Sequence, residues 1–169
     1  MEKALYKAVT EMNPLIYKDF YKFYFKKHYR AFNIVSTAIS VLLFALTAYF
    51  YVMNFGLMWT LIALWIAIVL LIYPRLAYRR VAKRASKSRQ TTRFRFYQDH
   101  VTEKTNGEET DYNYSELKEV WESKKYLFIF HSEDSVSIVV KSEVPDNGAE
   151  GLGALLRSNV TAYKKTNKF

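Results

Sequence analysis

The chain contains no cysteine, and its 169 residues include only five glycines and three prolines. Without cysteine it can form no disulfide framework, no thiolate nucleophile and no cysteine-based zinc site, as is usual for a domain in a reducing cytoplasm. None of the glycines has the spacing of a dinucleotide-binding or phosphate-binding loop. The composition therefore argues against thiol chemistry and against the common glycine-rich nucleotide sites.

Charge is also missing from one long stretch, residues 31–73. Residues 1–30 carry seven Lys/Arg and three acids, and residues 74–95 carry nine Lys/Arg and no acid. Residues 96–169 carry nine Lys/Arg and thirteen acids, so the net charge of +9 arises at the borders of the uncharged stretch. Basic residues that border an apolar block have a simpler role than nucleic-acid binding, and we predict no nucleic-acid partner.

The uncharged stretch is long enough for two membrane-spanning helices. Residues 32–53 would form about 33 Å of helix, against a hydrocarbon core of about 30 Å. Asn54, Phe55 and Gly56 have turn chemistry, and residues 57–73 form a second apolar run that ends at Pro74. A signal peptide would begin nearer the N-terminus, and a soluble core helix rarely lacks charge for so long. We therefore predict a two-helix transmembrane hairpin.

Basic residues flank this hairpin at only one of its ends. Five precede the first span and seven follow the second, whereas the connecting turn has none. Because Lys and Arg near a span favour the cytoplasmic side, both termini are predicted to be cytoplasmic in a multi-pass membrane protein. Residues 74–90 are predicted to be a basic linker.

Residues 13–31 have the pattern of an amphipathic helix next to the membrane. Asn13 is a good N-cap, and Pro14 suits the first helical position. Anionic headgroups at the inner leaflet attract basic side chains near the surface, and a merely solvated basic face is the alternative interpretation. The predicted anionic-lipid contacts from both flanks are Lys18, Lys22, Lys26, Arg30, Arg75, Arg79, Arg80, Lys83 and Arg84.

Residues 91–169 change to short alternating segments, which are typical of antiparallel strands. Asn106-Gly107 is a strong hairpin signal. A C-terminal helix is expected to start near Asp146 or Asn147 and to direct leucines towards the sheet. The expected strands are 92–97, 101–105, 109–114, 117–122, 126–130 and 136–140. The predicted fold class is thus a membrane α+β protein, with a small antiparallel β-domain after the hairpin.

The first twelve residues are separated from this β-domain by both predicted spans. Leu5, Lys7 and Val9 alternate with neighbours of different polarity, which permits an edge strand, whereas the alanines and lysines favour helix by propensity. The hairpin returns both ends of the chain to one side of the membrane, and a small domain gains from an additional strand. We predict a strand of the β-domain, with helix as the alternative.

Two adjacent spans and a basic linker precede a C-terminal region that opens with Phe-Arg-Phe-Tyr-Gln-Asp-His-Val at residues 94–101. Three further phrases follow, Tyr-Asn-Tyr-Ser-Glu-Leu-Lys-Glu-Val at residues 112–120, Lys-Tyr-Leu-Phe-Ile-Phe at 125–130 and Ile-Val-Val-Lys at 138–141. Together these features resemble the YcxB-like family of bacterial membrane proteins. That family is similar to bacterial pleckstrin-homology-like domains, which implies a curved sheet closed at one end by the C-terminal helix. The resemblance implies no particular activity or cofactor.

No group of residues has the spacing of a catalytic or metal site. His131, Ser132 and Glu133 include the residue types of a hydrolytic triad, but neighbours in a turn cannot converge at hydrogen-bond distances. The three histidines are far apart in sequence, without paired ligand spacing. We therefore predict no catalytic, metal-binding or cofactor-binding residues.

The functional hypothesis is a non-enzymatic, membrane-anchored scaffold. Its cytoplasmic domain would engage a protein or peptide at the inner leaflet, and anionic membrane lipids would be further partners. Two alternatives stay open, an immunity or resistance protein against a membrane-active peptide and an accessory subunit of a membrane complex. An intramembrane enzyme would need polar groups within the spans, where only small polar residues such as Asn33, Ser36 and Ser40 occur.

Overall fold

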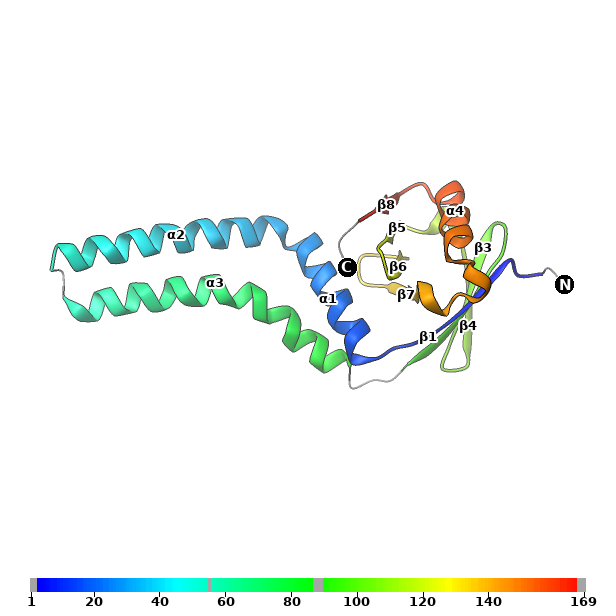
Figure 1. Ribbon diagram of the computed structural model, residues 1–169, viewed down its shortest axis with the longest axis horizontal. Coiled ribbons are helices and arrows are strands. Elements are labelled where there is room, and N and C mark those ends of the chain that lie inside the picture. Colours follow the sequence, from blue (N-terminus) through cyan, green and yellow to red (C-terminus); the bar gives the residue numbers. More distant parts are fainter. Residues whose placement is uncertain (1–2, 55, 87–89, 167–169) are drawn as a thin grey trace. The chain divides into compact units, whose positions relative to one another are not determined.

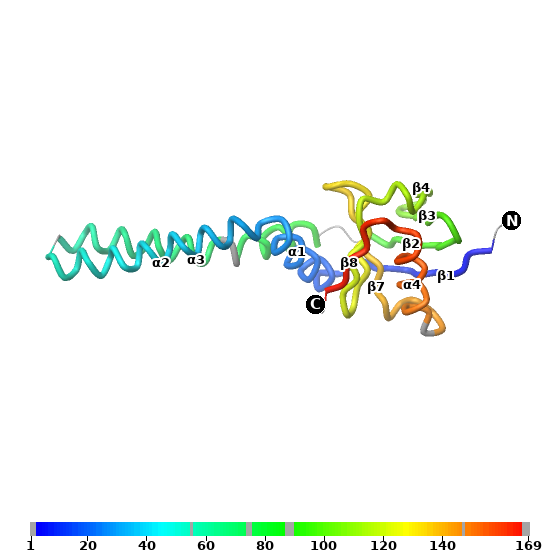
Figure 2. Tube along the Cα trace, turned by 90° about the horizontal axis from the view of Figure 1, so that it is seen from above, coloured from blue at the N-terminus to red at the C-terminus, as the bar shows by residue number. Residues whose placement is uncertain are grey.

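The computed structural model describes residues 3–54, 56–86 and 90–166 (Figures 1 and 2). The chain divides into two compact units. Asn13–Lys87 contains three helices, and Met1–Met12 with Ser88–Phe169 contains two mainly antiparallel sheets and a helix. The predicted α+β class is therefore confirmed.

The helical unit comprises α1 (Pro14–His28), α2 (Arg30–Val52) and α3 (Leu57–Ala85). Asn13 caps α1 as predicted, because its side-chain oxygen accepts hydrogen bonds from the backbone N–H groups of Leu15 at 2.9 Å and Ile16 at 3.0 Å. Tyr29 separates α1 from α2. The juxtamembrane segment therefore does not run into the apolar helix as one uninterrupted rod.

Helices α2 and α3 lie side by side and are joined at Asn54 to Gly56 (Figures 1 and 2). Among the described helices, α2 alone is long and apolar enough to cross a membrane as a single helix. α3 qualifies only if its two parts, Leu57–Tyr73 and Leu76–Ala85, count as one span, because they are bent by 46°. Pro74 lies at this bend, and a proline cannot donate the backbone hydrogen bond of a regular helix.

Helix α3 extends beyond the apolar run that ends before Pro74. Residues 74–85, which were expected to be a basic linker, are helical. Ala, Leu, Lys and Arg dominate this part and are strong helix formers, so the kink at Pro74 does not terminate the helix. The basic side chains are consequently presented at helical spacing.

The hydroxyl groups of the hairpin are bonded to backbone carbonyls. Ser36 Oγ donates to the Leu70 carbonyl of α3 at 2.7 Å, and Ser40 Oγ donates to the Ser36 carbonyl at 2.8 Å. Thr37 and Thr47 bond carbonyls one turn earlier in α2. The hydroxyl groups are thus satisfied by helix carbonyls, and Ser36 links α2 to α3.

The first sheet has the strand order β1-β2-β3-β4 and is antiparallel throughout. Its strands are β1 (Tyr6–Glu11), β2 (Thr91–Phe96), β3 (His100–Thr105) and β4 (Glu108–Asn113). β1 is the N-terminal segment for which an edge strand was predicted. Asn106 and Gly107 join β3 to β4 with φ values of 53° and 94°, as a tight hairpin turn requires.

The second sheet has the order β7-β6-β5-β8. It comprises β5 (Glu119–Glu122), β6 (Tyr126–Phe130), β7 (Val136–Val140) and the short β8 (Tyr163–Lys165). β8 pairs in parallel with β5 and was not predicted. Three-residue 3-10 helices lie at Tyr114–Glu116, Lys141–Glu143 and Pro145–Asn147.

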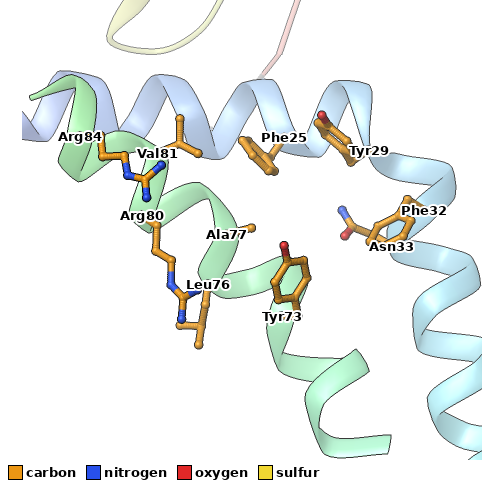
Figure 3. A pocket seen from close by; sticks show the side chains of 10 residues that line it. All are labelled: Phe25, Tyr29, Phe32, Asn33, Tyr73, Leu76, Ala77, Arg80, Val81 and Arg84. Atoms are coloured by element: carbon orange, nitrogen blue, oxygen red, sulfur yellow. The ribbon is translucent and has the colours of Figure 1, made fainter. Parts of the chain in front are cut away.

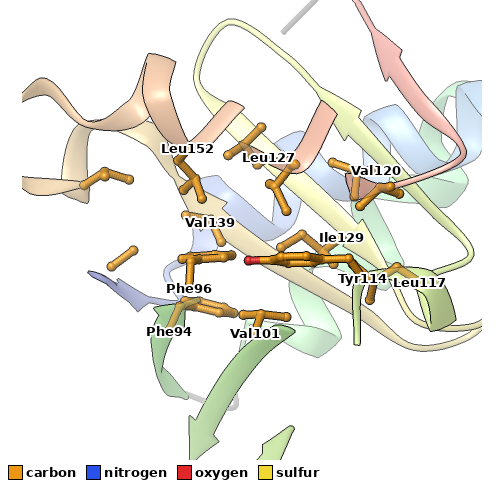
Figure 4. Packing of buried hydrophobic residues seen from close by; sticks show 14 residues of the cluster. Phe94, Phe96, Val101, Tyr114, Leu117, Val120, Leu127, Ile129, Val139 and Leu152 are labelled. Carbon is orange, nitrogen blue, oxygen red and sulfur yellow. The ribbon is translucent and has the colours of Figure 1, made fainter. Parts of the chain in front are cut away.

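Helix α4 (Ala149–Asn159) covers the core that the two sheets share. Figure 4 shows Leu152 of α4 packed with side chains from strands of both sheets. The sheets also meet at β1 and β7, where Val140 N donates to Thr10 Oγ1 at 3.3 Å. The predicted C-terminal helix is thus present, and its Leu152 and Leu156 are fully buried.

Candidate functional site

The helical unit contains a groove of about 500 Å³, lined by residues of α1, α2 and α3 and by Tyr29 between α1 and α2 (Figure 3). Its aromatic lining includes Phe25, Phe32 and Tyr73. Phe25 and Tyr29 stack with their ring centroids 4.9 Å apart, and the Tyr29 N–H donates to the Phe25 carbonyl at 2.9 Å. The end of α1 is thereby fixed as one wall of the groove.

One face of α3 forms the opposite wall. Six of its residues line the groove, and their spacing of three, four, seven, eight and eleven positions places them on one helical face. They are Tyr73, Leu76, Ala77, Arg80, Val81 and Arg84. This face changes from apolar to basic along the helix, because its last turns carry Arg80 and Arg84.

The basic part of the groove carries two guanidinium groups. Arg80 and Arg84 are exposed and lie one turn apart. No ion pair involving either guanidinium occurs among the residues that the structure describes. Residues 13–87 contain eleven Lys/Arg and a single acid, Asp19. Counter-charge for this surface must therefore come largely from outside the helical unit.

The structure groups only some of the nine predicted lipid contacts. Arg80 and Arg84 line the groove, and Lys22 and Lys26 line a second, smaller groove of about 270 Å³ together with Phe25 and Asn33. The exposed residues Lys18, Arg30, Arg79 and Lys83 line neither. The side chain of Arg75 lies outside the described part of the structure.

Sequence reasoning missed the uncharged half of the groove. Phe32, Asn33 and Tyr73 lie within the predicted spans, where no site was predicted. Figure 3 shows Asn33 and Tyr73 directed into the space that faces Phe25. The repeat of positions 73, 76, 77, 80, 81 and 84 is the signal that would have identified them. It was hidden because the helix was expected to stop at Pro74.

A second polar cluster lies in the α+β unit, where Glu103 of β3 meets His131 and Ser137 of the other sheet. Ser137 Oγ donates to Glu103 Oε2 at 2.5 Å, and His131 Nε2 lies 3.1 Å from Glu103 Oε1. The side chains of His131 and Glu103 are only 8% and 9% exposed. Tyr112 stacks on the imidazole with the ring centroids 3.9 Å apart.

This cluster contains the residue types of a hydrolytic triad but not its connections. Ser137 and Glu103 both approach the same imidazole nitrogen, Nε2, whereas a triad uses the two ring nitrogens separately. Ser137 gives its proton to the carboxylate, and the buried Nδ1 has no hydrogen-bond partner in the described structure. The geometry is that of a polar bridge between the two sheets.

Glu122 of β5 is the centre of a third cluster. Its carboxylate receives hydrogen bonds from Lys141 Nζ at 2.7 Å and Tyr163 Oη at 2.6 Å, and Lys165 Nζ lies 3.2 Å away. Burial would raise the pKa of Glu122, but these donors outweigh burial and lower the pKa to about 2. Burial and the bond to Glu122 raise the pKa of Tyr163. The cluster ties β5 to β8 and to the chain after β7.

Among the described residues, no three His, Asp or Glu side chains are arranged to hold a metal ion. No curated protein and no solved structure is significantly similar to the chain. The family model described as YcxB-like protein matches residues 96–152, which run from the end of β2 into α4. This match supports the predicted resemblance of residues 96–152 to the YcxB-like family.

Proposed function

We propose that α2 and α3 anchor the protein in the bacterial cell membrane as a two-helix hairpin. The observation that carries this proposal is the exposure of α2, since only 17% of its apolar 18-residue window is buried. A core helix of a soluble protein would have most of this surface covered. Large apolar side chains are exposed along α3 as well, among them Leu57, Trp65 and Ile72. Lipid would cover this surface.

The orientation follows from the charges at the two ends of the hairpin. The turn at residues 54–56 has none, and the basic residues lie in α1 and in the part of α3 beyond Pro74. On this basis both termini and the α+β unit are cytoplasmic. The α+β unit is nearly neutral, with fourteen Lys/Arg and fifteen acids. The helical unit would therefore provide most of the attraction to the anionic inner leaflet.

Reporter fusions test the anchor directly. A reporter that is active only outside the cytoplasm should be active when inserted between Asn54 and Gly56 and silent when fused after Lys168. Extraction of the protein by alkaline carbonate, or an active reporter at the C-terminus, would contradict the proposed topology. A second reporter that is active only in the cytoplasm serves as the control, because it should give the opposite result at each position.

We further propose that the α+β unit is a pleckstrin-homology-like module that engages a protein or peptide at the inner leaflet. Two sheets with a covering C-terminal helix fit that expectation. The proposed contact is the β4 edge of the first sheet, because five of its six residues are exposed and nothing pairs with its outer side among the described strands. Exposed edges of this kind accept an extended segment as an additional strand.

A site-specific photocrosslinker tests this contact in native membranes. Placed at Thr110 of β4, it should give a discrete adduct, whereas the same group at the exposed Ser158 of α4 should not. Adducts of equal yield at both positions would indicate collision and would contradict recognition through β4. Hydrogen exchange of the β3–β4 hairpin should slow when the adduct partner is added.

A further inference from the structure

We propose that the groove between α1, α2 and α3 binds one anionic phospholipid. Its phosphate would lie at Arg80 and Arg84, and the first part of an acyl chain would lie against Phe25, Phe32 and Leu76. The inference deepens the proposed function and rests on it, because it names a specific lipid site on the anchor in place of general attraction to a surface.

The lining of the groove separates polar from apolar groups as an amphiphile does. Arg80 and Arg84 occupy the part of α3 farthest from the apolar run, and Tyr73 and Leu76 occupy the part nearest to it. Asn33 adds an amide beside Phe32, on the α2 wall of the groove (Figure 3). A volume of about 500 Å³ is typical of a ligand site and accommodates a headgroup-proximal segment of a lipid.

The charges favour a phosphate over other occupants. A guanidinium can donate two parallel hydrogen bonds to phosphate oxygens, and two guanidiniums one helical turn apart can share one phosphate. The helical unit of a second copy would bring eleven basic residues and one acid to the groove, so like charges oppose that occupant. A free inorganic phosphate would leave the aromatic and aliphatic lining exposed, whereas a lipid covers it.

Arg79 and Lys83 provide a matched control within the same helix. They have the same i, i+4 spacing as Arg80 and Arg84, carry the same charge and are exposed, but they do not line the groove. The full chain and its variants would be titrated in mild detergent with phosphatidylglycerol or phosphatidylcholine and examined by native mass spectrometry. The bound stoichiometry and the apparent Kd are the quantities to compare.

Wild type should bind one phosphatidylglycerol in preference to phosphatidylcholine. The Arg80→Gln/Arg84→Gln variant should bind it about tenfold more weakly or worse, because it loses the charge-assisted hydrogen bonds that the two guanidiniums would donate to the phosphate. Arg79→Gln/Lys83→Gln should stay within about twofold of wild type, because neither side chain lines the groove and neither would donate to the phosphate. Ala77→Leu, which fills the groove without changing charge, should also weaken binding.

Three results would overturn the inference. They are equal losses in the two double variants, no preference for phosphatidylglycerol in wild type, and a lipid-free dimer that persists when the lipid is added. The topology reporters and carbonate extraction, applied to the same variants, separate this result from the anchor. A chain that is integral but does not select phosphatidylglycerol contradicts only the lipid site, whereas a chain that is not integral contradicts the proposed function itself.

Discussion

The phenol ring of Tyr6, in β1, lies against the backbone of Gly151 in α4. A Cβ atom added at Gly151 would overlap the Tyr6 hydroxyl and would lie 3.0 Å from Tyr6 Cζ. Gly148, just before α4, would meet the same ring at 3.0 Å. These glycines at the start of α4 thus leave room for the side chain of Tyr6, which belongs to a strand that precedes both apolar helices in the chain.

Gly151→Ala should therefore destabilise the α+β unit by about 1–3 kcal/mol, because the ring must shift within a packed site. Gly153→Ala is the matched control on the same helix. Its added Cβ would be 3.4 Å from the Tyr163 hydroxyl, an ordinary contact, and alanine is a better helix former than glycine. Thermal unfolding in detergent should show a lower midpoint for the first variant and an equal or higher midpoint for the second.

The contact can be isolated with a double-mutant cycle. Tyr6→Ala should itself destabilise the unit, but Gly151→Ala should cost much less when the tyrosine is absent, because its partner in the overlap is gone. Additive effects of the two substitutions would show that the cost of Gly151→Ala does not come from this contact.

The bridge between the sheets supplies a second prediction. Ser137→Ala removes the donor to Glu103 Oε2 and leaves a buried carboxylate with fewer hydrogen bonds, so we expect a loss of about 1–3 kcal/mol in the free energy of unfolding. Ser135→Ala, at an exposed position in the preceding turn, should change the stability little. Equal midpoints for the two variants, measured by thermal or urea unfolding, would show that the bridge contributes nothing.

Most strands could be predicted because their signals lie in the strands and turns themselves. Asn106-Gly107 demands a tight hairpin, and the runs 126–130 and 136–140 coincide with β6 and β7. β8 escaped prediction since three residues, Tyr163–Lys165, carry too little alternation. Next to this pairing, Glu122 of β5 contacts Tyr163 and Lys165, which lie more than forty residues later in the chain. A contact between such distant residues leaves no local pattern in the sequence.

The groove was only half predicted for a related reason. The charges of Arg80 and Arg84 are visible in the sequence, but their apolar neighbours belong to a helical face only if the helix continues through Pro74. Proline ends many helices and merely bends others, and the choice depends on what the rest of the helix packs against. Here α1 packs against α3, and this tertiary contact has no signature in either segment alone.

Removal of β1 gives a third prediction. Ala8 and Thr10 of β1 are buried, and β1 pairs with β2 along its whole length, so deletion of residues 1–11 should lower the unfolding midpoint of the α+β unit. Loss of the hydrogen bond from Val140 N to Thr10 Oγ1 would also weaken the contact between the two sheets. Lys7→Gln, at an exposed position of β1, is the control and should leave the midpoint unchanged. An intact midpoint after the deletion would mean that β1 is dispensable.

The fourth prediction concerns the substitution of Glu122. Glu122→Gln should lower the free energy of unfolding at neutral pH by about 1–3 kcal/mol, because Lys141, whose side chain is 18% exposed, would lose its anionic partner. Glu116→Gln removes one carboxylate from an exposed site and should have little effect. The comparison of the two variants at neutral pH separates the cluster from the general effect of net charge.

The same cluster makes a prediction about acid. The pKa of Glu122 is about 2 in the folded protein, below its ordinary value of 4.5, so the folded state binds this proton less readily than the unfolded state. The stabilisation is therefore complete above about pH 4.5 and is lost as the pH falls towards 2. Because the carboxylate is partly open to solvent, we expect the stability lost over this pH range to be about 2 kcal/mol, less than the full pKa shift would give. Urea unfolding from pH 5 to pH 2 should show a smaller decline for Glu122→Gln than for wild type, and parallel declines would mean that the cluster does not couple protonation to folding.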